Sequence, residues 1–282
     1  MMRIGSMVLT GLVDGQMRLW ADAIYPRVSA SDWSRHQHLL VDDGIVRMSL
    51  GGFLVRGIGE RTVLIDAGAG PRFDLPSALG QVVTCGLMPG QLASLGVAPA
   101  DITDVVFSHL HHDHVGWASV DGEPFFPNAT YWCHELDWCH FMESAGDQRV
   151  VSALEPVRDQ VELWSLDFTL VPGIELSFSP GHTPGSVCIF LATADEMMAL
   201  IGDVAHSPIE LLIDVPGPGD LDPHRASLTR TFILQRIRAN SWICGSHFPD
   251  LQCGVIANGG SQWLWGPCLA GQTSKRAHAH GE

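Results

Sequence analysis

Four histidines and one aspartate fall within the six residues from His109 to His114, directly after an apolar run that ends at Phe107. Imidazole and carboxylate groups packed this closely lose hydration, and only cations between them can compensate for the loss. Divalent cations such as Zn²⁺ bind these ligand types in open catalytic sites. His109 and His111 can face one ion, whereas Asp113 and His114 open the following helix and can face another. The segment therefore predicts a loop that binds two metal ions.

Short apolar runs typical of strands recur along the chain, and five of them are closely followed by an Asp or a His. The residues at these five ends are Asp66, His109, His182, Asp203 and His247. Ligands usually bind at the carboxyl ends of the strands in an α/β sheet, so these residues are expected to share one site.

Helical patterns lie between the strand patterns and favour an α/β layered fold. They cover residues 88–96, 134–145 and 222–239, the last beginning at Asp222 as a plausible N-cap, with Leu228 and Phe232 near a helical period. Residues 206–224 are rich in proline and glycine, and we expect them to form an irregular lid over the site. Because no repeat of fixed period appears, residues 1–282 are expected to form one domain, with a polar tail from about 270.

Composition excludes several partners. The chain has 31 acidic and 16 basic residues, a formal net charge of -15, and such a chain repels phosphate backbones and anionic lipid. No apolar run reaches the roughly 18 residues that cross a bilayer. The seven cysteines form an odd set without a CxxC pair, which favours reduced thiols. We expect a cytoplasmic protein that binds neither nucleic acid nor membrane and acts on a small molecule; a homodimer stays open.

Weaker features support ordinary structural roles. The cluster from Cys133 to His140 suggests a third metal, but helical spacing scatters it around the axis, which favours an amphipathic helix. A solvated helix face is the expected place for three arginines, which are Arg230, Arg236 and Arg238. Six aromatic residues are candidates for the walls of an apolar pocket, namely Trp20, Tyr25, Trp33, Trp117, Phe125 and Phe126.

In order and spacing, five stretches between about Phe53 and Trp265 resemble the motifs of the metallo-β-lactamase fold superfamily of metal-dependent hydrolases. They read VLIDAG, SHLHHDHVG, SPGHTPGS, ALIGDVAHSP and GSHFP. The resemblance implies a four-layer αβ/βα sandwich and two divalent ions, zinc first, with manganese, iron or cobalt as alternatives.

The resemblance also implies the ligands. One ion is implied to bind His109, His111 and His182, the other to bind Asp113, His114 and His247, and Asp203 is implied to bridge them. Asp66 resembles the aspartate that steadies the metal loop, whereas His112 occupies a position that varies in the family and is not expected to be a ligand.

Within the superfamily, the sequence looks most like the branch of acyl-homoserine-lactone lactonases, pyridoxolactonase and methyl-parathion-hydrolase-like enzymes. Two residues depart from the pattern of many relatives. Ser186 stands where many have a second histidine after GHTPG, and His206 stands where lactonases of the branch often have a tyrosine that touches substrate. The absence of a cysteine ligand argues against the commonest di-zinc β-lactamase class.

The expected reaction is ester hydrolysis, with lactones first, by a hydroxide that bridges the two metals. Two divalent ions carry +4, and Asp113, Asp203 and hydroxide return -3, which leaves a site of about +1 that attracts electron-rich oxygen. Asp113 or His206 is expected to carry the proton. The alternatives are a phosphotriester hydrolase of the same branch and a mono-iron dioxygenase. A nucleic-acid-processing enzyme and a non-catalytic binding protein are disfavoured, by the missing basic patch and by the complete ligand set.

Overall fold

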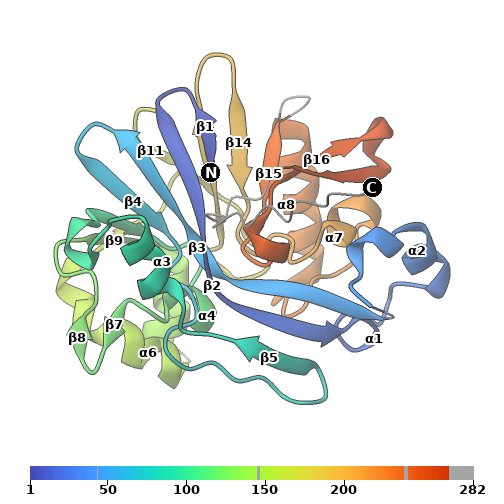
Figure 1. Cartoon of the computed structure of the whole chain (residues 1–282), viewed down its shortest axis with the longest axis horizontal. Coiled ribbons are helices and arrows are strands. Elements are labelled where there is room, and N and C mark those ends of the chain that lie inside the picture. Colours follow the sequence, from blue (N-terminus) through green and yellow to red (C-terminus); the bar gives the residue numbers. More distant parts are fainter. Residues whose placement is uncertain (43, 145–146, 238–240, 267–282) are drawn as a thin grey trace, which may run out of the picture.

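Two β-sheets pack face to face in the computed structural model, and helices cover the outer face of each sheet (Figure 1). The structure describes residues 1–42, 44–144, 147–237 and 241–266. The polar tail expected from about residue 270, and Arg238, lie outside the described residues.

The first sheet combines a long antiparallel part with a short parallel part. In spatial order it contains β1 (Met2–Ile4), β2 (Met7–Trp20), β3 (Ile45–Ile58), β4 (Arg61–Ile65), β6 (Asp104–Val106), β9 (Thr130–His134) and β10 (Val161–Trp164), while β5 (Gly80–Thr84) pairs with β2. β2 and β3 run antiparallel from the pair Val8 and Arg56 to the pair Trp20 and Ile45. β4, β6 and β9 run parallel, so their carboxyl ends meet at one edge.

The second sheet is mostly antiparallel. In spatial order it contains β11 (Phe168–Val171), β12 (Ile174–Phe178), β13 (Val187–Ala192), β14 (Met197–Leu200), β15 (Trp242–Cys244), β16 (Gly254–Ala257) and β17 (Gln262–Trp265). β14 and β15 are its parallel pair, with Leu200 beside Cys244. A separate hairpin pairs β7 (Ser119–Val120) with β8 (Glu123–Pro124).

The α-helices are short except the last. They are α1 (Ala21–Ile24), α2 (Ala30–Arg35), α3 (Met88–Ser94), α4 (His112–Val115), α5 (Glu135–Trp138), α6 (Gln148–Leu154), α7 (Pro208–Ile213) and α8 (Pro223–Arg236). The predicted N-cap is confirmed, because the side chain of Asp222 accepts a hydrogen bond from the backbone N–H of Arg225. The helix expected at 134–145 is α5 followed by a π-helical turn, Cys139–Ser144.

Apolar side chains form three layers of packing between the four structural layers. One layer joins the inner faces of the two sheets, including Phe53 and Ile189. Another joins the first sheet to α3 and α6 through Met88 and Leu154, and a third joins the second sheet to α7 and α8. The four-layer αβ/βα sandwich expected from the sequence is therefore confirmed.

One expectation about the α8 segment is wrong, because Arg230 is 2% exposed and does not lie on a solvated face. Leu228 and Phe232 lie in the helix, as expected, and are 58% and 51% exposed. Arg230 points inward because it pairs with carboxylates there. Its Nε lies 3.2 Å from Asp214 and its Nη1 lies 3.5 Å from Asp220.

The lid expected at 206–224 is irregular only in part, because residues Pro208–Ile213 form α7. The proline at the first turn costs this helix no hydrogen bond, since a backbone N–H at that position would have no partner within the helix. The helix ends at Asp214, which adopts a left-handed conformation with φ of 46°. The irregular lid begins only after this residue.

The structure also changes what was expected of the cysteines and of some aromatic residues. Cys244 and Cys253 are joined by a disulfide, because β15 and the segment before β16 bring their Cα atoms to 4.4 Å, whereas the sequence favoured reduced thiols. Trp117 and Phe126, two of the candidates for pocket walls, lie in the packing between the first sheet and its helices. Tyr25 is only 1% exposed, but it lines a cavity, as the sequence predicts.

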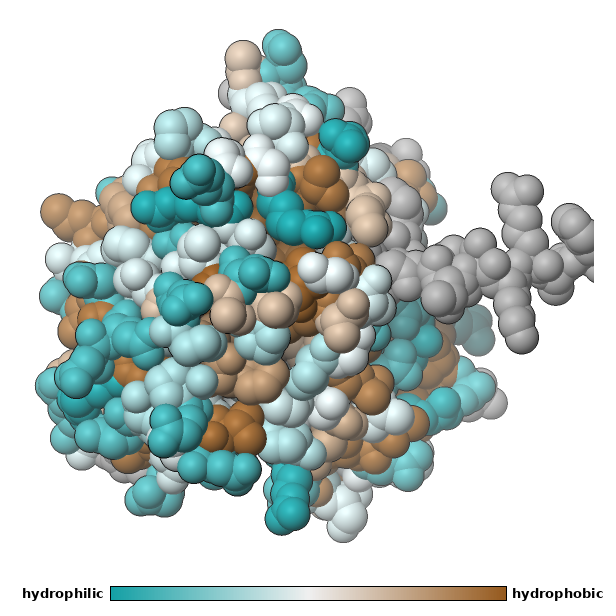
Figure 2. Space-filling view, turned by 60° about the vertical axis from the view of Figure 1, so that its left-hand side comes forward, coloured by the Kyte–Doolittle hydropathy of each residue, from teal (hydrophilic) through white to brown (hydrophobic). Residues whose placement is uncertain are grey.

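No helix in the described ranges is long and apolar enough to cross a bilayer. On the face shown in Figure 2, hydrophilic side chains are mixed with smaller hydrophobic areas. This agrees with the acidic composition of the chain, in which 31 of 282 residues are acidic.

A buried aspartate ties the long strands to the loops at the sheet edge. Asp14 in β2 is 0% exposed, and its carboxylate accepts backbone hydrogen bonds from Ala69, Gly70 and Met88 and a side-chain hydrogen bond from Trp117. Burial raises the pKa of Asp14, and these donors oppose the rise. The carboxylate thus holds together the segments on both sides of the first motif.

We predict that Asp14→Ala lowers the free energy of unfolding by about 3 kcal/mol or more, because several buried donors lose their acceptor. Asp22→Ala, which changes an exposed aspartate of α1, is the matched control and should change stability by less than about 0.5 kcal/mol. Urea unfolding of both variants measures the difference. Equal stabilities would show that the Asp14 hydrogen bonds contribute nothing net.

Candidate metal centre

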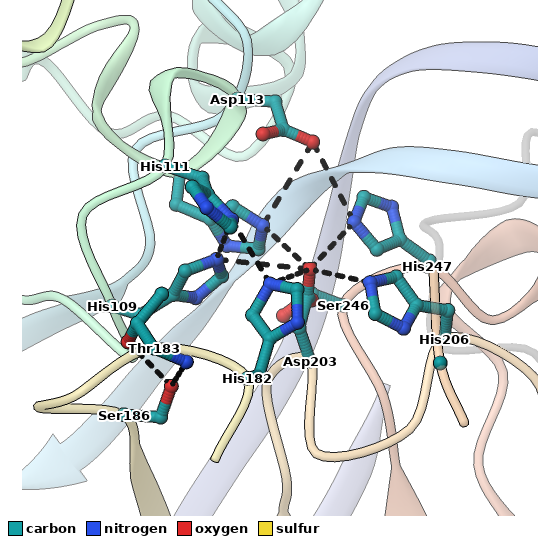
Figure 3. A network of polar contacts seen from close by, with 12 residues as sticks. His109, His111, Asp113, His182, Thr183, Ser186, Asp203, His206, Ser246 and His247 are labelled. Carbon is teal, nitrogen blue, oxygen red and sulfur yellow. Dashed lines mark hydrogen bonds and ion pairs between the residues drawn. The ribbon is translucent and has the colours of Figure 1, made fainter. Parts of the chain in front are cut away.

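One carboxylate oxygen lies at the centre of the histidine cluster (Figure 3). The Oδ2 atom of Asp203 is within 3.7 Å of an Nε2 atom from each of five histidines: His109 at 3.7 Å, His114 at 3.4 Å, His182 at 3.5 Å, His206 at 3.2 Å and His247 at 3.0 Å. Asp203 and His206 follow β14, and the other four imidazoles come from the segments that follow β6, β12 and β15. The strand ends therefore meet at one site, as the sequence predicts.

On one side of Asp203, three imidazoles face one another. The Nδ1 atom of His111 lies 3.0 Å from Nε2 of His109 and 2.9 Å from Nε2 of His182. Together with Asp203, these nitrogens form a group whose ligand atoms lie within 4.8 Å of one another. This group can hold a metal ion.

A second group lies on the other side and contains Asp113, His114 and His247. The Oδ2 atom of Asp113 is 3.5 Å from Nε2 of His247 and 3.9 Å from Nε2 of His114. Three buried atoms in the cluster have no hydrogen-bond partner: Nε2 of His114, Nδ1 of His206 and Oδ1 of Asp203. Buried polar atoms without partners are costly, and in an imidazole and carboxylate set they fit divalent cations.

The outer nitrogen of each of four imidazoles in the cluster meets an oxygen atom. The Nδ1 atom of His114 lies 2.9 Å from Asp66, that of His182 3.2 Å from Asp220, that of His247 2.8 Å from the backbone oxygen of Ser49, and that of His109 3.1 Å from the hydroxyl of Ser108. Such contacts fix the ring orientation and leave the inner nitrogen free for a metal.

Asp66 connects three parts of the site. Its carboxylate accepts hydrogen bonds from the backbone and hydroxyl of Ser108 and from the hydroxyl of Ser246, besides its contact with His114. The residue has φ of 60°, a left-handed conformation that is uncommon outside glycine but is tolerated by aspartate. It lies behind the cluster, where the resemblance places it.

The charges within the cluster are arranged to favour cations. Burial and the neighbouring His182 lower the pKa of His111 to about 3, so its nitrogen lone pair is free at neutral pH. Burial alone would raise the pKa of Asp113, but the nearby histidines outweigh it and lower the pKa to about 2. In the same way, burial opposes ionisation of Asp203, yet the surrounding imidazoles hold its pKa well below the usual range. Neutral imidazoles and ionised carboxylates are the forms that bind metal.

Three supporting acidic residues escaped the sequence analysis. Asp220 lies in the lid, Glu210 lies in α7, and Asp137 lies in the helix assigned an ordinary role. Each is a single acidic residue without a motif, so neither spacing nor periodicity could identify it. The burial of their segments by the adjacent loops makes them partners of the site.

Asp137 fastens two ligand-bearing loops to each other. Its carboxylate accepts hydrogen bonds from the backbone of Leu110, the hydroxyl of Thr183 and the backbone of Gly185. Leu110 stands between His109 and His111, while Thr183 follows His182. Burial raises the pKa of Asp137 to about 6, against the effect of these donors.

The two departures from the family pattern have different surroundings. The hydroxyl of Ser186 accepts a hydrogen bond from the backbone of Thr183 and lies 2.6 Å from the Thr183 hydroxyl, so it closes the His182 loop. His206 lies within the cluster beside Asp203. His112, by contrast, stacks on Phe73 and accepts a hydrogen bond from Arg149.

Comparisons with known proteins agree with this geometry. The sequence model of the Metallo-beta-lactamase superfamily matches residues 52–238. N-acyl homoserine lactonase AiiA of Bacillus thuringiensis subsp. kurstaki is 27% identical over 137 residues, which cover 48% of this chain and 51% of that protein. N-acyl homoserine lactonase AiiB of Agrobacterium fabrum is 26% identical over 181 residues, which cover 56% of this chain and 63% of that protein. The chain thus spans about half the length of the first curated relatives it matches.

Solved structures share the fold over nearly the whole chain. AidC, a dizinc quorum-quenching lactonase, has a TM-score of 0.80 at 22% identity, with 94% of this chain and 96% of that chain covered. The hydrolase AbOPH of the beta lactamase superfamily has a TM-score of 0.79 at 24% identity, with the same coverage. At these identities the likeness shows the fold alone.

We predict that Asp137→Asn lowers the free energy of unfolding by about 1–3 kcal/mol, because an amide N–H₂ group would face one of the three donors. The affinity for added Zn²⁺ should fall as well, since the two loops lose their common acceptor. Asp121→Asn, at an exposed turn position, is the matched control and should change neither quantity. Thermal unfolding and zinc titration measure the two effects, and an Asn variant with unchanged zinc affinity would contradict the positioning role.

Proposed function

Because this chain belongs to the metallo-beta-lactamase superfamily, we propose that it is a hydrolase that uses two divalent metal ions to open ester bonds, with lactones as the first substrate class. The observation that carries the proposal is the convergence of five imidazoles on the carboxylate of Asp203, with Asp113 beside two of them. The N-acyl homoserine lactonases among its relatives support the choice of lactones.

We assign the ligands as the sequence suggests. His109, His111 and His182 would hold one ion, Asp113, His114 and His247 would hold the other, and Asp203 would contact both. The burial of the cluster and its atoms without partners support this assignment. Zinc is the first choice of metal because AidC, with a similar fold, is a dizinc lactonase, and manganese, iron and cobalt are the alternatives.

Divalent ions held by these residues would supply Lewis-acid chemistry, that is, polarisation of a carbonyl oxygen and a hydroxide nucleophile at neutral pH. The protein's own groups do the rest. Asp113 and His206 are the candidate proton carriers, because both lie at the cluster and Asp113 is one of its less buried members. The ring opening of a lactone needs little separate binding of the leaving group, because the alkoxide stays tethered.

A cavity beside the metal centre supports a small, partly apolar substrate. It has a volume of about 390 Å³, and the lining includes Ile24, Tyr25, Val28, Val215, Pro216 and Pro218. Gly217 and Gly219 line the same cavity, and the position of a Cβ atom on Gly219 would be 3.6 Å from the ring of His182. The lid segment is thus a common wall of the cavity and the metal centre.

We further propose that residues 1–282 act as one domain in the cytoplasm, on a small molecule and without nucleic acid, as a monomer or homodimer. The net charge of -15 supports the exclusion of nucleic acid. The molar mass in solution, measured by light scattering, distinguishes a homodimer from a monomer.

We predict that His109→Ala and Asp203→Asn each abolish lactone hydrolysis while the protein stays folded, because each variant loses one of the proposed metal ligands. The expected loss of kcat/KM is at least about 10³-fold, as for other groups that stabilise a transition state directly. His38→Ala, at an exposed histidine, is the control and should keep full activity. Circular dichroism checks folding, and full activity in either cluster variant would refute the ligand assignment.

We predict two metal ions per chain in protein purified without added metal, and higher kcat/KM for lactones than for phosphotriesters. Elemental analysis and paired assays measure both. One iron per chain with no hydrolysis would favour the dioxygenase, and a preference for a paraoxon-type substrate would favour the phosphotriester hydrolase. A protein that binds no metal would contradict the proposal as a whole.

A further inference from the structure

We propose that His206 is an eighth metal ligand of the centre, in addition to the seven side chains assigned above. The inference rests on the proposed function only in requiring that metal binds at the cluster. In this proposal, Nε2 of His206 donates its lone pair to a divalent cation that Asp203 and His247 also bind.

The first support is the position of the inner nitrogen. Nε2 of His206 lies 3.2 Å from Oδ2 of Asp203, closer to this oxygen than the corresponding atoms of His109, His114 and His182. Asp203, His206 and His247 form a group of potential ligands whose atoms lie within 4.8 Å of one another, and all three are buried.

The second support is the contact of the outer nitrogen. A metal-binding histidine almost always turns its other ring nitrogen to a carboxylate, a backbone oxygen or water. In this site His114 faces Asp66 and His182 faces Asp220 in this way. His206 also turns its outer nitrogen toward a carboxylate, because its Nδ1 atom is 3.5 Å from Oε1 of Glu210, although the two atoms form no hydrogen bond. The inner nitrogen of the imidazole therefore faces the cluster and the outer one faces an acidic side chain.

Glu210 is itself held in place, which makes it a dependable partner for the ring. Its side chain is fully buried and its Oε1 atom accepts hydrogen bonds from the hydroxyl of Tyr25 and from the backbone of His206 and Ser207. The lid closes over this pair, because a Cβ atom on Gly217 would lie 2.6 Å from Glu210 and 3.0 Å from Nδ1 of His206. No side chain can enter at that point without moving the carboxylate or the ring.

Neighbouring rings fix the plane of the imidazole. The ring of His206 is parallel to that of His247, with an interplanar angle of 2° and 5.3 Å between centroids, and it contacts the edge of His182 at 4.8 Å. The side chain is only 7% exposed. The ring is thus enclosed by its neighbours and held in one orientation at the cluster.

The test uses the full chain loaded with Co²⁺. Ring N–H protons of coordinating histidines give strongly shifted proton NMR signals, and Nδ1 of His206 is buried beside Glu210 and Gly217. The variants are His206→Ala and Glu210→Gln, and His112→Ala is the matched control, because the His112 ring packs on Phe73 away from the cluster. Competition with a chelator gives the metal affinity.

We expect His206→Ala to lose one shifted N–H signal and to bind the second Co²⁺ at least about tenfold more weakly. Glu210→Gln, which keeps the imidazole and guards against a folding defect in the first variant, should weaken binding in the same direction. His112→Ala should match the wild type. A His206→Ala protein that keeps every shifted signal and the full affinity overturns this inference and leaves the hydrolase proposal intact, whereas wild-type protein that takes up no Co²⁺ or Zn²⁺ overturns both.

Discussion

The buried carboxylate of Asp203 is the interaction on which the rest of the site depends. Five imidazole nitrogens surround one of its oxygens at 3.0–3.7 Å, and the other oxygen has no hydrogen-bond partner. Without cations, a cluster of this composition would have to balance desolvation with protonated rings alone. The strand ends and loops of both sheets are arranged so that these groups meet. Metal binding is the simplest explanation for this cluster of imidazoles and carboxylates at the sheet edge.

Single acidic side chains hold that arrangement in place. Asp14, Asp66 and Asp137 each accept hydrogen bonds from segments that are far apart in the sequence. Each carboxylate gives a partner to several backbone or hydroxyl donors that would otherwise be unsatisfied, and buried donors without partners are costly. The loops can therefore be irregular and still hold the imidazoles in fixed orientations.

The sequence predicted the layered fold and the residues that meet at the sheet edge, because strand ends and the spacing from His109 to His114 leave a local pattern. It failed where the deciding contacts are long-range. Arg230 was expected on a solvated face, but three carboxylates from α7 and the lid draw it inward. Asp137 and Asp220 carry no motif at all, and the disulfide between Cys244 and Cys253 depends on strand pairing that spacing alone does not reveal.

The lid meets the metal centre with its backbone at two glycines and with a side chain at Asp220, which contacts His182. At Gly217 and Gly219 the chain passes over the imidazoles with no room for a Cβ atom at 217. Val215, Pro216 and Pro218 line the adjoining cavity together with both glycines. For directed evolution of substrate range, these three residues are therefore the positions to randomise, whereas Gly217 between the two prolines has to stay glycine.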